Sequence, residues 1–64
     1  MIRININQSG RSINGYPPCY MVGIENIAYL GDTDNFAEAF DIANKAVKNY
    51  PNMGLFIQYN PWKG

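Results

Sequence analysis

The stretch GYPPCYM, residues 15 to 21, contains the single cysteine of this 64-residue chain, Cys19. A nucleophilic cysteine needs a lowered thiol pKa, which a histidine, a nearby cation or a helix N-terminus supplies. The chain contains no histidine, and Cys19 precedes a predicted strand rather than a helix. We therefore interpret Cys19 as a small, partly buried side chain at the start of a strand, and the two prolines before it as stiffening the loop.

Carboxylates offer a second candidate chemistry. Asp32 and Asp34 lie close together in the turn GDTDN, a spacing that suits Mg²⁺ or Ca²⁺ bound through oxygen ligands. A calcium loop of the EF-hand kind needs further acidic positions, whereas this segment passes directly into a predicted helix, so helix capping is the better interpretation. Asp32, Glu38 and Asp41 are expected near a solvated helix end, where nothing raises a carboxyl pKa for acid–base catalysis. We predict no metal site, no cofactor and no catalytic residue.

The composition narrows the classes of partner and compartment. Five Lys and Arg balance five Asp and Glu, and this zero formal charge argues against a strongly basic nucleic-acid binder. One cysteine excludes an internal disulfide framework, and the compartment is most simply the cytoplasm. The start MIRININQ alternates, unlike a signal peptide, and no apolar run reaches the roughly 20 residues that span a bilayer. The bias towards Asn, Ile, Lys and Tyr would suit a phage or mobile element.

Alternating hydrophobicity predicts the first strands. Residues 2 to 7 place three isoleucines on one face and polar residues on the other, as in a half-buried strand. Residues 8 to 19 are interrupted by glycine, an Asn-Gly pair and two prolines, which indicates a long loop. Residues 20 to 30 allow two interpretations. One continuous strand is slightly favoured over a hairpin that turns at Glu25-Asn26. The hairpin stays open as an alternative, because burying Asn26 in a central strand would be unusual.

A helix follows, from residue 36 to 50. Thr33, Asp34 and Asn35 can each cap its first backbone amides, and Glu38 stands three residues after Asn35 as in a capping box. Pro51 ends the helix. Its apolar residues recur at spacings of three and four, which predicts one buried stripe made of Phe36, Ala39, Phe40, Ala43, Ala46, Val47 and Tyr50.

The elements predict a single small α+β domain over residues 1 to 64. Residues 55 to 60 alternate again as a last strand, so the order is strand, strand, helix, strand, with a fourth strand if 20 to 30 is a hairpin. One helix then packs on one face of an antiparallel or mixed sheet. If the last strand runs parallel to the strand before the helix, the first strand lies between them, pairs antiparallel with both and leaves two edges.

The aromatic residues point to recognition of another protein. The helix stripe accounts for three of them, but the others cannot all fit inside a core that one helix shields. Tyr and Trp are enriched at the centres of interfaces, and the uncovered face of a small sheet is a natural place for them. The candidate partner-binding residues are Tyr16, Tyr20, Phe56 and Trp62, with Arg11 as an anion contact.

We therefore expect a non-enzymatic protein–protein binding module, an accessory or inhibitor protein of a phage or mobile element that occludes a partner's surface. Homodimerisation through a sheet edge or the uncovered face is compatible with this expectation. The alternative is weak single-stranded nucleic-acid binding through the sheet face, where Arg3, Arg11 and Lys63 join the aromatic residues. No membrane partner is expected.

Folding explains Trp62 least among the aromatic residues, because it follows the last predicted strand in the segment NPWKG. We predict that Trp62→Ala weakens binding or self-association more than it lowers the melting temperature. A large fall in melting temperature with unchanged association would contradict this prediction.

Overall fold

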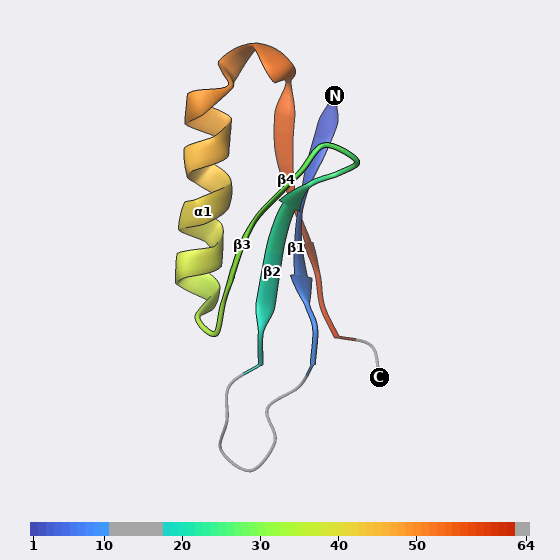
Figure 1. Cartoon of the computed structure of the whole chain (residues 1–64), viewed down its shortest axis with the longest axis vertical. Coiled ribbons are helices and arrows are strands. Elements are labelled where there is room, and N and C mark those ends of the chain that lie inside the picture. The colour runs from blue at the N-terminus through green and yellow to red at the C-terminus, as the bar shows by residue number, and fades with distance from the viewer. Residues whose placement is uncertain (11–17, 63–64) are drawn as a thin grey trace.

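The computed structural model describes residues 1–10 and 18–62, which form a four-stranded mixed sheet with one α-helix on one face (Figure 1). The sheet order is β3-β2-β1-β4. The elements in chain order are β1 (Ile2–Gln8), β2 (Tyr20–Ile24), β3 (Ala28–Thr33), α1 (Phe36–Asn49), the 3-10 turn η1 (Pro51–Met53) and β4 (Leu55–Asn60). The predicted α+β class is confirmed. The sheet has four strands, the larger of the two numbers that the sequence allowed.

β1 lies at the centre of the sheet, as its alternating sequence predicts. It pairs antiparallel with β2, with Ile4 opposite Ile24, and parallel with β4, with Ile4 opposite Ile57. Ile4 and Ile6 face α1 and are completely buried. The period of two therefore places one side of β1 in the core and leaves its polar residues on the opposite face.

A hairpin joins β2 to β3, so residues 20–30 form two strands and not the slightly favoured single strand. The Ile27 N–H donates to the Ile24 carbonyl oxygen at 3.0 Å. Asn26 has φ 62°, a left-handed conformation that asparagine tolerates better than most residues. The expectation that the first strand pairs antiparallel with both of its neighbours is also wrong, because the hairpin adds one reversal of the chain. Because β3 runs parallel to β1, a last strand parallel to β3 must pair with β1 in parallel.

α1 begins at the predicted cap. Asn35 has extended backbone angles, and its Oδ1 accepts the Glu38 N–H at 3.2 Å. The capping box is modified, since the Glu38 carboxylate lies 2.8 Å from the Thr33 hydroxyl, and that hydroxyl oxygen accepts the Asn35 N–H. The helix ends before Pro51, where the Tyr50 N–H donates to the Ala46 carbonyl oxygen.

The helix stripe is only partly as predicted. Its buried residues are three alanines, Ala39, Ala43 and Ala46, whereas the aromatic residues of the stripe are 40–50% exposed. Small side chains let α1 lie close to the sheet, so Phe36 and Phe40 flank the contact instead of filling it. The prediction that the core accounts for Phe36, Phe40 and Tyr50 is therefore wrong.

The core is small and lies between α1 and the centre of the sheet. Its buried residues are Ile4, Ile6, Val22, Ile24, Ala39, Ala43 and Ala46. Within the described residues, no helix combines the length and apolar character that crossing a membrane would require. α1 packs more closely against β2 and β3 than against β1 and β4, so one helix leaves part of a four-stranded sheet thinly covered.

Candidate partner-binding surfaces

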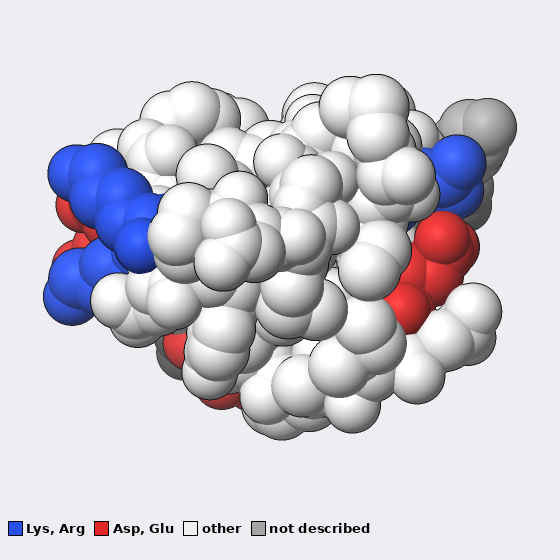
Figure 2. Space-filling model, turned by 90° about the horizontal axis from the view of Figure 1, so that it is seen from above, with Lys and Arg blue, Asp and Glu red and all other residues white. Residues whose placement is uncertain are grey.

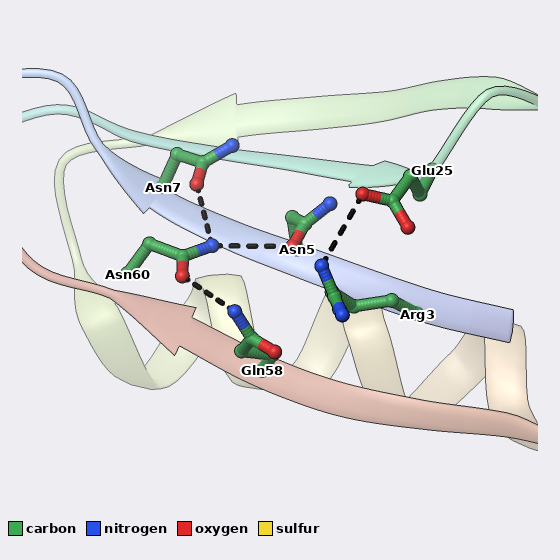
Figure 3. Close-up of polar contacts among 6 residues, drawn as sticks. All are labelled: Arg3, Asn5, Asn7, Glu25, Gln58 and Asn60. Atoms are coloured by element: carbon green, nitrogen blue, oxygen red, sulfur yellow. Dashed lines mark hydrogen bonds and ion pairs between the residues drawn. The ribbon is translucent and has the colours of Figure 1, made fainter.

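The sheet face turned away from α1 is here called the open face, and Figure 3 shows polar side chains of β1 and β4 on it, with Glu25 beside Arg3. Strand alternation and register place its residues. They are Arg3, Asn5 and Asn7 of β1, Met21 and Gly23 of β2, Tyr29 and Asp32 of β3, and Phe56, Gln58 and Asn60 of β4.

Four amide side chains form a connected cluster on β1 and β4, here called the amide cluster (Figure 3). Asn60 Nδ2 donates to Asn7 Oδ1 at 2.7 Å and to Asn5 Oδ1 at 3.1 Å. Gln58 Nε2 donates to Asn60 Oδ1 at 2.8 Å. Asn60 is fixed by all three bonds, while the NH₂ groups of Asn5 and Asn7 donate to no other side chain among the described residues. These two groups are donors available to a bound molecule.

Arg3 and Glu25 form an ion pair at the other end of β1. Their Nη1 and Oε1 atoms are 3.4 Å apart, and the two side chains are 40% and 43% exposed. An ion pair with this exposure contributes at most about 1 kcal/mol to stability. Arg3 Nε is buried without an acceptor in the described part of the chain. Among the described residues of the open face, Arg3 is the cation, and Glu25 neutralises it. This ion pair weakens the attraction of the open face for phosphate groups.

A pocket of about 400 Å³ lies on the β2–β3 half of the open face. Gly23 belongs to its lining and presents no side chain there. A Cβ at this position would lie 3.1 Å from the Ala28 carbonyl oxygen, so the close approach of the two strands favours glycine. Met21, Ile27 and Tyr29 also line the pocket and are 41%, 56% and 62% exposed. Three large apolar side chains therefore surround a hollow in the sheet.

The Tyr29 hydroxyl has a raised pKa. Partial desolvation by its neighbours is the main cause, and the nearby Asp32 carboxylate raises the pKa further because it opposes a second negative charge. The Cys19 thiol contributes in the same direction. A tyrosine hydroxyl is neutral at physiological pH, so Tyr29 presents a group that donates and accepts hydrogen bonds beside an apolar ring.

A second hollow, here called the α1–β4 groove, lies on the helix side of the sheet and has a volume of about 490 Å³. Tyr59 and Phe36 meet there edge to face, with ring centroids 5.0 Å apart, and Tyr20 packs on Phe36 at 5.5 Å. The Tyr59 hydroxyl donates to Gln8 Oε1 at 2.8 Å. The groove is lined by Ile6, Phe36, Phe40, Asn44, Val47, Leu55, Phe56, Ile57 and Tyr59.

Charged side chains are unevenly distributed at one end of the molecule (Figure 2). Seen from the end of the molecule that carries the α1–β4 turn, they gather mainly at two opposite sides, with an uncharged surface between them (Figure 2). No charged residue is among the lining of the α1–β4 groove. Such a surface attracts a partner through apolar contact and hydrogen bonding more than through charge.

The residues predicted as a binding site do not form one surface. Tyr20 packs on the helix side, while Phe56 is half-buried on the open face. Trp62 follows β4 and is 45% exposed. Arg11 and Tyr16 lie outside the described residues. Alternation along a strand assigns faces, but the sequence alone did not show which face of β2 and of β4 meets the helix.

Sequence reasoning missed the exposed residues of both hollows. Met21 and Ile27 look like ordinary strand residues, and Phe36, Phe40 and Tyr59 fit apolar stripes that predict burial. An available signal was the Ala-rich helix, because alanines bring a helix close to a sheet and leave larger neighbours outside the contact.

The residues considered for chemistry lie at one end of the β2–β3 pair, where the register places Tyr20 opposite Thr33. Cys19 is half-buried, and its carbonyl oxygen accepts bonds from the backbone and hydroxyl of Ser9. Asp32 and Asp34 are exposed. In the described ranges, no three His, Cys, Asp or Glu side chains are placed to hold a metal ion.

Comparisons with known proteins give no relative. No protein-family model matches the chain. No curated protein and no solved structure matches it significantly either. The functional argument therefore depends on the geometry of the two surfaces.

Proposed function

We propose that this protein is a non-enzymatic protein–protein binding module that covers a surface of another protein with the open face of its sheet. One observation carries the proposal. Met21, Ile27 and Tyr29 remain 41–62% exposed around the pocket beside Gly23, although the same sheet buries isoleucines on its other side. A group of apolar side chains left in water around a hollow is typical of a binding surface.

The surroundings of this pocket have the composition of an interface. Protein interfaces combine an apolar centre with a polar rim that forms hydrogen bonds. Here the amide cluster and the Arg3–Glu25 pair border the pocket. Asn5 and Asn7 belong to the amide cluster and also line the pocket, and Glu25 lines it as well. A partner that inserts an apolar side chain beside Tyr29 would also meet the NH₂ groups of Asn5 and Asn7, which donate to no other side chain in the described ranges.

Occlusion is the mode of action that this arrangement supports. A small domain with a polar sheet face and an apolar pocket on that face can block a partner's site without chemistry of its own, which suits an inhibitor or accessory protein. We place this activity in the cytoplasm, on the support of a single, unpaired cysteine in the sequence.

Affinity capture tests the proposal. The tagged protein is used to recover partners from lysate of its own host, in nuclease-treated and untreated halves read by mass spectrometry. We expect one protein to be recovered at near-stoichiometric amounts from both halves. Recovery that is lost on nuclease treatment would overturn the proposal and favour single-stranded nucleic acid as the ligand.

A further inference from the structure

We propose that a second copy of this chain binds along the free edge of β4 and closes the α1–β4 groove. This inference goes beyond the proposed function, because it uses the opposite side of the sheet from the pocket beside Gly23. The two proposals can therefore fail separately.

β4 is an edge strand of the sheet, with no further strand paired to its outer side among the described residues. Its six residues, LFIQYN, include no charged residue and no proline, and its pairing with β1 is regular throughout. The other edge, β3, has a register irregularity opposite Val22 and Gly23, and it carries the exposed carboxylate of Asp32. Bulges and charges on an edge oppose pairing with another chain, and an edge that has neither favours it.

The register of β4 shows which backbone groups are free. The Ile2 N–H donates to the Gly54 carbonyl oxygen, and Ile2 lies opposite Leu55. In a parallel ladder, the N–H and C=O groups of Ile2 then bond to the residues before and after Leu55. The same pattern repeats at every second residue of β1. Leu55, Ile57 and Tyr59 therefore point their N–H and C=O groups away from β1.

These outward groups fit a second copy in one antiparallel register. A twofold axis at Ile57 pairs this residue with itself and pairs Leu55 with Tyr59 of the second copy, so that every outward group meets its complement. On the helix side the pairs are apolar. On the open face Phe56 lies opposite Gln58 of the second copy, and no charged pair arises.

The outward-pointing residues of β4 also line the α1–β4 groove. The lining contains no charged residue, so the groove suits the apolar edge of a second copy better than a charged partner. Leu55, Ile57 and Tyr59 form one wall, Phe36 and Phe40 of α1 form another, and both phenylalanines are about 40% exposed. Joining two β4 edges brings two such grooves together, so the exposed rings of each copy are covered by the other. The chain has 64 residues, and seven of those that the structure describes form its buried core, so this burial adds substantially to a small core.

Register-specific cross-linking tests the proposal. Phe56→Cys and Gln58→Cys are made separately, each with Cys19→Ser to remove the native thiol. In the proposed register, position 56 faces position 58 of the second copy with Cα atoms about 4.5 Å apart, which allows a disulfide. Two copies of position 56 lie about 7–8 Å apart on the diagonal, which is too far.

We expect the equimolar mixture to form a covalent dimer under mild oxidation, and neither variant alone to do so. No dimer in the mixture, or equal cross-linking in all three samples, would overturn the proposal. Sedimentation equilibrium of the unmodified chain gives the second measurement, with twice the 7.2 kDa chain mass expected. Ile57→Lys should give the monomer mass while Tyr29→Ala stays dimeric, and a 7.2 kDa species across a concentration series of the native chain would contradict the dimer.

Discussion

At the scale of single residues, Tyr29 combines an exposed side chain with a hydroxyl whose pKa is raised. Tyr29 is 62% exposed at the pocket, and desolvation together with the Asp32 carboxylate raises the pKa of its hydroxyl. A raised pKa means that the folded protein favours the protonated phenol. The resulting contribution to stability is present below the ordinary tyrosine pKa of 10.0 and is lost as the pH rises through the raised value.

We predict that Asp32→Asn lowers the pKa of Tyr29, because the mutation removes the nearby negative charge while the desolvation remains. Carbon-13 NMR of labelled tyrosine over an alkaline pH series measures this change. An unchanged Tyr29 titration would mean that Asp32 does not act on the hydroxyl.

The cap at Asn35 is a second prediction at this scale. Its Oδ1 accepts the Glu38 N–H, so Asn35→Ala leaves one helix donor without its protein partner and should cost about 1 kcal/mol of unfolding free energy. Asn35→Asp keeps the acceptor and should change stability much less. Urea denaturation measures both variants. Equal stability of Asn35→Ala and the native chain would contradict the assigned cap.

At the scale of elements, the sequence predicts those parts that have a clear period. The first and last strands and the helix lie within one residue or so of the expected ranges, because alternation and three-to-four spacing are local properties. Residues 20–30 remained ambiguous, since a three-residue turn at 25–27 interrupts the alternation only slightly. That turn then determined the parallel pairing of β1 and β4, which no local pattern could reveal.

The left-handed conformation of Asn26 gives the test at this scale. Asn26→Val should destabilise the hairpin by about 1–2 kcal/mol, because a β-branched side chain is strained at positive φ. Asn26→Gly is the matched control and should be close to neutral, since glycine adopts this conformation freely. Thermal and urea unfolding compare the two. If valine and glycine gave the same stability, the turn would not have the described geometry.

At the scale of the whole molecule, two surfaces remain after folding, one on each side of the sheet. The aromatic content of the sequence predicted that some large side chains stay exposed, and this is confirmed. Which ones stay exposed could not be predicted. The tertiary position of α1 decides it, since the helix lies nearer β2 and β3 and leaves Phe36 and Phe40 beside the groove. The predicted residues Tyr20 and Phe56 were consequently divided between the two faces.

The measurement that tests the central claim most directly is the affinity of the captured partner for two matched tyrosine variants. Tyr29→Ala removes the ring at the pocket, and Tyr50→Ala removes a ring of similar exposure at the end of α1. We predict that Tyr29→Ala weakens binding by about 30-fold or more, as expected for a central interface residue, while Tyr50→Ala binds like the native chain. Native affinity in Tyr29→Ala, with its fold intact, would contradict the assignment of the open face as the binding surface.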